Sequence, residues 1–269
     1  MNAARSKNLI GFRVAIPRPL FIGIAFSATV VLMVTWWVIW YVGVFPEAFF
    51  PGPHHVFSSG IRMLFVEDFS RDILASVARI LVAFIVSALL AIPLGFLMSC
   101  FKPAEAFVEP MIDFVRYVPV PALLPLFVLW TGIGETPKFL VLFFGTFFQL
   151  VLLIKDDADN VKPINFDLAR TMGASSIQLI RDVLFPAMLP HIYDRLRVTL
   201  GWCWTYLVIA ELVAVEKGVG FTIKEAQRFS ASDRLFVCFI VLGLIGLFTD
   251  LTAKFLFHRL FPYAGKLRA

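Results

Sequence analysis

Three charged side chains lie inside long apolar stretches of the sequence: Arg79, Arg116 and Glu211. A charge within a hydrocarbon layer is costly, so it normally pairs with another charge or faces a water-filled cavity. Arg116 is suited to attracting an anion, because a guanidinium donates charge-assisted hydrogen bonds to the oxygens of an oxyanion. The alternative is that either arginine forms an ion pair with Glu211, Asp113 or Asp72 and so fixes helix packing. The sequence favours pairing, and direct contact with a solute stays open.

Aromatic side chains and prolines accompany these charges. Trp202, Trp204 and Tyr206 lie close together in one apolar stretch, where helix packing is favoured over a ligand cage. If a solute passes through the protein, the candidate path comprises Arg116, Pro119, Pro121, Glu211 and Trp202.

No set of residues suited to catalysis is present in the sequence. A GxxxxGK[ST] loop is absent, so the chain does not itself supply a phosphate cradle. Ser-His-Asp, HExxH and CxxC arrangements are also absent. The cysteines Cys100, Cys203 and Cys238 lie in or beside apolar stretches without metal-ligand spacing, and adjacent His54 and His55 would point apart on a helix. The sequence therefore predicts neither an enzyme nor a bound cofactor or metal.

The composition is that of an integral membrane protein. Hydrophobic residues make up 59% of the chain and charged residues 16%, which is outside the usual range of soluble domains. The 269 residues suit one bundle of membrane-spanning helices, each of which needs about 20 apolar residues. The net charge of +5 is explained by cytoplasmic loops rather than by nucleic acid. We expect an all-α membrane protein in contact with lipid.

Six spans are predicted. Lys and Arg are more frequent in the tails and in the loops that follow the second and fourth spans, which places both termini and those loops in the cytoplasm. The predicted organisation is a cytoplasmic tail (1–19), a six-helix domain (20–258) with a cytoplasmic loop at about 160–190, and a second cytoplasmic tail (259–269). The spans are predicted at residues 20–44, 72–100, 104–132, 139–154, 192–215 and 235–257.

Proline is concentrated in the third predicted span. Pro110, Pro119, Pro121 and Pro125 all lie within it, so it cannot be one straight helix. Carbonyls freed by prolines at membrane depth are tolerated only against protein or water. We therefore expect this span to face the interior of the protein or the centre of a dimer.

The most informative polar stretch is residues 167–190, between the fourth and fifth spans. Gly173 follows a helix-compatible segment and suits the left-handed turn that closes a helix. Ser175 precedes Gln178 by the spacing of a capping box. We expect a second, short helix with Ile177, Ile180 and Leu184 on one face, stopped soon after Pro186.

This stretch resembles the EAA loop of ABC importer permeases, which reads Glu-Ala-Ala, then Gly, then a terminal Ile-x-Leu-Pro. Asp167, Leu168 and Ala169 match the triplet at the family's spacing, and Leu168 is its bulkiest departure. Gly173 matches the glycine, and the end is matched by Val183, Phe185 and Pro186. In the family this loop inserts into a groove of a cytoplasmic ATPase subunit. The coupling residues that the resemblance and the local pattern indicate are Asp167, Leu168, Ala169, Gly173, Ala174, Ser175, Gln178 and Pro186.

The resemblance extends from about residue 45 to 262. RYVPVPALLPLFVLWTGIGETPK, SVARILVAF with IPLGFLMS, and AELVAVEKGVGFTI are similar to segments of the nitrate, sulfonate, taurine and bicarbonate permeases. This similarity implies a type I importer permease fold in a bacterial inner membrane. It also implies a second permease copy, two ATPase subunits that carry the ATP and Mg²⁺, and an extracytoplasmic solute-binding protein.

The solute remains open on sequence grounds. The resemblance favours a small anion such as nitrate, a sulfonate, taurine or bicarbonate, but relatives also import uncharged or vitamin-precursor solutes. An autonomous ion-coupled carrier or channel is the alternative class. A carrier would be expected to show matching halves, and the two halves of this sequence do not match.

Overall fold

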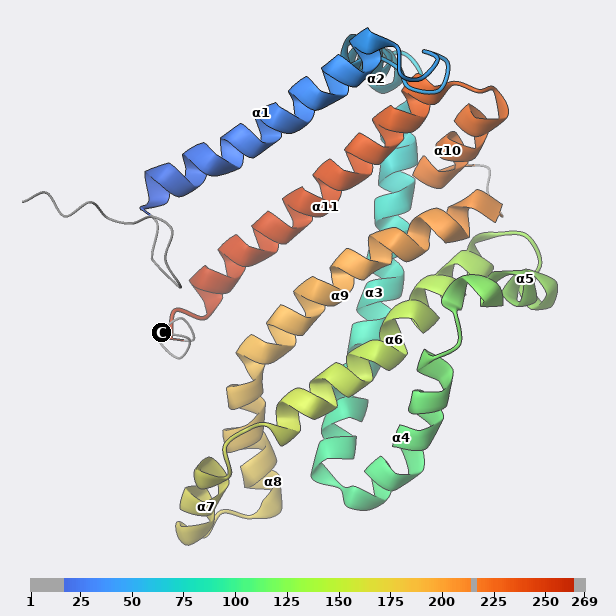
Figure 1. Cartoon of the computed structure of the whole chain (residues 1–269). Coiled ribbons are helices and arrows are strands. Elements are labelled where there is room, and N and C mark those ends of the chain that lie inside the picture. The colour runs from blue at the N-terminus through green and yellow to red at the C-terminus, as the bar shows by residue number, and fades with distance from the viewer. Residues whose placement is uncertain (1–16, 214–216, 264–269) are drawn as a thin grey trace, which may run out of the picture.

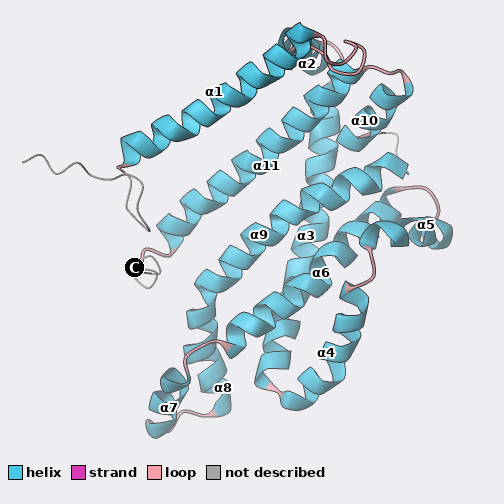
Figure 2. Ribbon diagram, in the orientation of Figure 1, coloured by secondary structure: helices cyan, strands magenta, loops and turns pink. Residues whose placement is uncertain are grey.

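The computed structural model describes residues 17–213 and 217–263, and every regular element in these ranges is a helix (Figures 1 and 2). The predicted end of the fifth span at Val215, and most of the two predicted tails, lie outside the described residues. Five helices are long and apolar enough to cross a membrane, and a sixth span is possible if one bent pair of helices counts as one. The five are α1 (Arg18–Val42), α3 (Phe69–Cys100), α6 (Glu135–Asp159), α9 (Phe185–Val213) and α11 (Ser232–Leu260).

The bent pair is the proline-rich third span. It consists of α4 (Lys102–Arg116) and α5 (Val120–Thr131), whose axes differ by 96°. Pro119 is the N-cap of α5, and Pro121 lies in its first turn. Backbone N–H groups in a first turn have no acceptor within the helix, so a proline there costs no helical hydrogen bond. The expectation that this span is not one straight helix is confirmed.

Shorter helices connect the spans. They are α2 (Pro53–Phe65), α7 (Pro163–Thr171), α8 (Ser176–Gln178), the π-helix η1 (Leu179–Leu184) and α10 (Val219–Arg228). The connection between the fifth and sixth predicted spans contains α10, a helix that the sequence analysis did not predict. Val219, Ile223 and Ala226 are buried on one face of this helix. Their helical spacing is the sequence pattern from which α10 could have been predicted.

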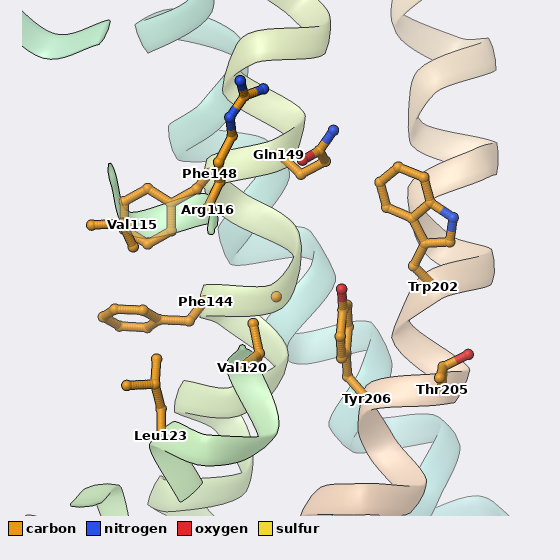
Figure 3. A pocket seen from close by; sticks show the side chains of 11 residues that line it. Val115, Arg116, Val120, Leu123, Phe144, Phe148, Gln149, Trp202, Thr205 and Tyr206 are labelled. Atoms are coloured by element: carbon orange, nitrogen blue, oxygen red, sulfur yellow. The ribbon is translucent and has the colours of Figure 1, made fainter. Parts of the chain in front are cut away.

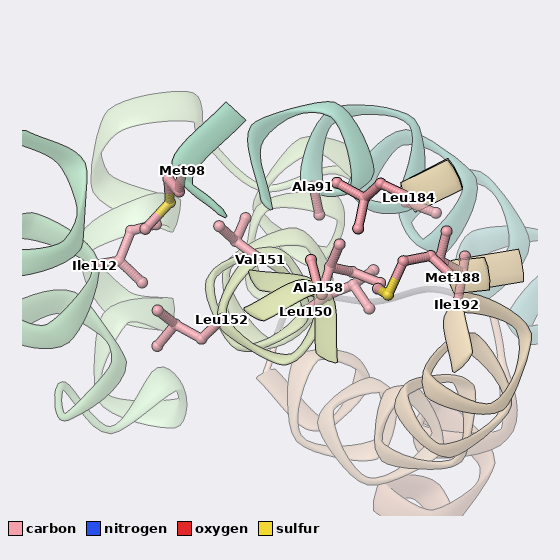
Figure 4. Close-up of a cluster of buried hydrophobic side chains, with 12 residues drawn as sticks. Ala91, Met98, Ile112, Leu150, Val151, Leu152, Ala158, Leu184, Met188 and Ile192 are labelled. Atoms are coloured by element: carbon pink, nitrogen blue, oxygen red, sulfur yellow. The ribbon is translucent and has the colours of Figure 1, made fainter. Parts of the chain in front are cut away.

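Helix α6 lies at the centre of the described bundle, between α3, α5 and α9 (Figure 1). Its C-terminal half carries Leu150, Val151 and Ile154, which are fully buried in the cluster of Figure 4. α3 approaches α6 closely at Gly95, where an added Cβ would lie 2.8 Å from Cβ of Ile154. The backbones therefore meet because position 95 has no side chain.

The limits predicted for the fourth span were too narrow. α6 begins at Glu135 rather than at Phe139, and it continues past Ile154 to Asp159. Its charged C-terminal end stays helical because those charges have partners on neighbouring helices. Lys155 Nζ lies 2.9 Å from Glu105 Oε1 of α4, and Asp157 accepts two hydrogen bonds of 2.6 Å from Arg195 of α9.

The prediction that the helix after Ser175 stops near Pro186 was also wrong. One helical rod runs from Ser176 to Val213. Before the proline the rod widens into η1, where Phe185 N–H donates to Ile180 O, five residues earlier. This wider turn accommodates Pro186, which has no backbone N–H to donate.

Helix α1 is attached chiefly through its C-terminal end, and none of its apolar window is buried. Trp36 Nε1 donates to Pro51 O at 3.1 Å and its ring stacks on Phe236 at 5.5 Å. Trp40 contacts the edge of the His54 ring at 4.8 Å. Trp36 and Trp40 thus pack against protein.

Replacing Gly95 with alanine is expected to destabilise the contact of α3 with α6. The new methyl group would collide with Ile154 and with Val151 O, 2.9 Å away, and overpacking of this kind costs about 1–3 kcal/mol. The thermal midpoint of the protein purified in detergent should fall. Gly243→Ala is the control, because no atom lies within 4 Å of that Cβ; equal midpoints for the two variants would contradict the packing account.

Candidate functional site

The loop between α6 and α9 has two well-defined helix ends. α7 closes in a left-handed turn at Gly173, with φ of 85°. Gly173 N–H donates to Arg170 O at 2.9 Å and Ala174 N–H donates to Ala169 O at 3.0 Å, the pair of bonds of a Schellman motif. The expected helix-closing glycine is therefore confirmed.

The next helix starts with the predicted capping box. Ser175 N–H donates to Gln178 Oε1 at 2.8 Å, and Gln178 N–H donates to Ser175 Oγ at 3.4 Å. These two bonds satisfy backbone donors that the first turn of a helix leaves free. The turn and the cap together fix the angle between α7 and the rod that follows.

The face predicted for this second helix was only partly right. Leu184 is buried, but Ile177 is 76% exposed, and Leu179 rather than Ile180 is the other buried residue. The π-turn is the reason, because its wider winding brings residues five apart onto one face. Sequence periodicity of the ordinary α-helix could not anticipate it.

Along α7 and its C-cap runs an apolar stripe of Ile164, Leu168 and Met172, which we call the loop stripe. These side chains are 66%, 64% and 82% exposed. Their spacing places them on one side of a helix. Asp167 is also exposed, 3.9 Å from Arg170 Nη1. The loop therefore presents apolar surface that the described part of the chain does not cover.

A pocket of about 370 Å³ lies between the α4–α5 break, α6 and α9 (Figure 3). Two members of the candidate path, Arg116 and Trp202, line it, whereas Pro119 and Pro121 do not. The prolines instead form the break that carries Arg116 and Val120 to the pocket. The lining residues are Val115, Arg116, Val120, Leu123, Phe144, Gly145, Phe148, Gln149, Trp202, Thr205 and Tyr206.

Arg116 is held on its own helix. Its Nε lies 3.1 Å from Asp113 Oδ1, and Nη2 donates to the hydroxyl of Tyr117 at 3.3 Å. The side chain is 33% exposed. The predicted pairing with Asp113 is confirmed, and Arg116 is at the same time one of the residues that line the pocket.

Glu211, the remaining member of the candidate path, lies apart from the pocket. It is fully buried and forms an ion pair with Arg79, at 2.6 Å between Oε1 and Nη1. Ser76 Oγ donates to it at 2.8 Å and Gly220 N–H at 2.8 Å. The structure therefore assigns Glu211 to helix packing, as the pairing alternative predicted, and not to the lining of the pocket.

Sequence reasoning missed several partners in this buried network. Arg79 also binds Glu135 through two hydrogen bonds, of 2.5 and 2.8 Å. Asp72 accepts from Gly218 N–H at 2.9 Å and from Thr222 Oγ1 at 3.2 Å. The network joins α3, α6, α9 and the start of α10. No local pattern in the sequence shows which of these distant charges meet.

The family model described as the inner membrane component of binding-protein-dependent transport systems matches residues 87–262 of this chain. The chain belongs to this family. The permease is 31% identical to the taurine transport system permease protein TauC of Escherichia coli, over 88% of each chain. It is 30% identical to the putative aliphatic sulfonates transport permease protein SsuC of Bacillus subtilis, over 87% of this chain and 84% of SsuC.

The fold has solved counterparts. An inward-facing structure of the MetNI methionine ABC transporter superposes with a TM-score of 0.64, covering 71% of this chain and 95% of that one, at 17% sequence identity. The permease is thus an all-α type I ABC importer membrane subunit, a transport component of an inner membrane, as the resemblance implied.

Glu211→Gln is expected to destabilise the permease by about 3 kcal/mol, because it removes one partner of a buried ion pair. Arg79 still pairs with Glu135 after the substitution, so the expected loss of stability is at the lower end of the range for broken buried ion pairs. Thermal unfolding in detergent measures the change. Lys254→Ala is the control, since that lysine is 51% exposed in its pair with Asp250 and should cost less than about 1 kcal/mol. Normal stability with an altered solute preference would overturn the packing role.

Proposed function

We propose that this permease forms the solute pathway of an ATP-driven importer for a small anion, and that its loop at about 160–190 docks onto a cytoplasmic ATPase subunit. The observation that carries the docking is the loop stripe. Exposed large apolar side chains on a rigid, capped loop are typical of a partner surface. ATP and Mg²⁺ bind to the partner, because this sequence has no phosphate-binding loop.

The assembly that follows has two permease copies, two ATPase subunits and an extracytoplasmic solute-binding protein. Both termini and the loop lie in the cytoplasm, which the distribution of Lys and Arg supports. ATP binding closes the ATPase pair, and the loops convert the closure into a switch between two arrangements of the spans. Asp167, Ala169, Gly173 and Ala174 lie at this contact.

The anion class is supported by two observations. The relatives named above include a taurine permease and an aliphatic sulfonates permease, two classes of sulfonate solute. The pocket of this chain contains a cationic side chain, Arg116, and no carboxylate among its lining residues. A guanidinium in such a site favours oxyanions.

Leu168→Asp is expected to abolish copurification of the ATPase subunit. The substitution introduces charge into an apolar contact, yet the exposed position of Leu168 leaves the fold intact. ATP hydrolysis in the eluate of the tagged permease measures the retained partner. Arg181→Ala is the control, because that side chain is 84% exposed outside the loop stripe. Retention of full hydrolysis by Leu168→Asp would show that the stripe is not the docking surface.

The solute class is tested by uptake in cells with and without the permease. A labelled panel would hold nitrate, bicarbonate, taurine, an alkanesulfonate and a vitamin precursor. We expect loss of uptake of one anion when the permease is deleted. Loss of the vitamin precursor alone would contradict the anion class while leaving the docking proposal intact.

A further inference from the structure

Helix α2 has three chemically different sides. One side packs against the protein through Val56, Ser59 and Met63, which are buried. A second side is apolar and exposed, and we call it the α2 stripe. Its members are each between 40% and 83% exposed, and their separations of three and four residues place them on one side of a helix. The α2 stripe consists of Phe57, Ile61, Leu64 and Phe65.

The third side of α2 is polar and carries His55, Ser58 and Arg62, all of them exposed. Ser58 Oγ donates to His55 O at 2.9 Å, and Arg62 Nε lies 3.1 Å from Glu67 Oε1. His55 Nε2 lies 2.8 Å from Glu47 Oε1. At about 3.6 residues per turn, this polar side lies between the buried side and the α2 stripe. The helix therefore meets protein on one side, with an exposed apolar side roughly opposite and a polar side between them.

α2 lies beside a span, not beyond its end. A Cβ built at Gly60 of α2 would lie 3.6 Å from Cγ2 of Val237, in the second turn of α11. At about 1.5 Å per residue, Val237 is about 7.5 Å along α11 from its first residue. The adjacent Phe239 and Ile240 of α11 are 56% and 40% exposed. The level of α2 thus coincides with exposed apolar surface on a helix that is apolar enough to cross a membrane.

A second span meets α2 at its other end. Trp40, near the C-terminal end of α1, contacts the ring of His54 in the first turn of α2. Tyr41 and Val42, the next residues of α1, are 72% and 67% exposed. Two helices that are apolar enough to span a membrane therefore both carry exposed apolar side chains at the level of α2.

The surroundings of the α2 stripe differ from those of the loop stripe. The loop stripe lies at the opposite end of the structure (Figure 1), and Asp167 and Arg170 beside it are both more than 60% exposed. The α2 stripe instead continues the exposed apolar surface of α1 and α11. Such surface on a membrane span faces lipid, and a helix with one apolar and one cationic polar side is typical of the boundary between acyl chains and head groups.

We propose that α2 lies along the membrane boundary, with the α2 stripe against lipid acyl chains and with Ser58 and Arg62 in the head-group layer. Arg62 reaches water from this position because the stem of an arginine can cross apolar surface while its guanidinium stays hydrated. α2 is thus a membrane-surface anchor that joins the ends of α1 and α11 to the lipid.

The test uses fluorescent labels on single cysteines of the full-length permease in lipid vesicles. The background is Cys100→Ser, since Cys203 and Cys238 are fully buried. A label on Phe65→Cys is expected to be quenched by lipids that carry a nitroxide on the acyl chain and to be protected from iodide in the water. Phe65 is 83% exposed, so its replacement leaves the fold intact.

Three control positions calibrate the two quenchers. Leu244→Cys on α11 is the lipid reference, because that residue is an exposed apolar side chain on a span. Ser58→Cys, on the polar side of α2, should be quenched several-fold less by the nitroxide lipid than Phe65→Cys is. Leu168→Cys of the loop stripe is the reference for an apolar position in water and should be quenched by iodide.

Two results would overturn the proposal. Quenching of the Phe65→Cys label by iodide, to the extent found for Leu168→Cys, would place the α2 stripe in water. Protection from both quenchers would show that another protein surface, such as a second copy of the chain, covers the stripe.

A charge substitution supplies an independent measurement. Ile61→Asp should lower the thermal midpoint of the permease in vesicles, because it moves a charge into the acyl region. Ser58→Asp should leave the midpoint unchanged, and equal midpoints for the two variants would contradict the lipid contact. Neither experiment involves solute uptake or the ATPase subunit, so both outcomes are independent of the proposed function.

Discussion

Polar groups placed among apolar helices must find a partner or water, and this constraint shapes the whole permease. Where partners exist, they are drawn from distant parts of the chain, as Arg79 of α3 binds Glu211 of α9 and Glu135 of α6. Where prolines remove backbone donors, the third span breaks into α4 and α5, with a bend of 96°. Other polar side chains, among them Gln149 and Thr205, line a cavity. The ion pairs, the bend in the third span and the cavity all follow from the free-energy cost of leaving polar groups unpaired among apolar helices.

Helix α6 is the element that makes these contacts along its whole length. Its N-terminal end is bound to α3 through Glu135, and its C-terminal end to α4 and α9 through Lys155 and Asp157. Between the two ends its backbone contacts α3 at Gly95 and the Tyr206 ring at Gly145. A helix fixed at both ends and contacted closely along its length is a stable wall for a pocket whose other walls belong to α4, α5 and α9.

The sequence predicted best what neighbouring residues decide among themselves. Gly173, the Ser175–Gln178 box and the bend near Pro119 each depend on a few adjacent residues, and each is present. The missed features depend on tertiary partners. Lys155 and Asp157 stay helical because Glu105 and Arg195 are nearby, and the rod passes Pro186 because η1 redirects its hydrogen bonds. The pocket needed the structure, since Gln149 and Tyr206 meet only in space; Arg116 and Trp202 were anticipated from their types.

The unbroken rod from Ser176 to Val213 has a mechanical consequence. Its first residues belong to the loop between α6 and α9, and Trp202, Tyr206 and Glu211 lie toward its far end. At about 1.5 Å per residue it is about 57 Å long, and η1 lies near its first residues. The rod therefore joins the loop to the pocket wall through continuous helix, and the buried ion pair of Glu211 with Arg79 fixes its far end to α3.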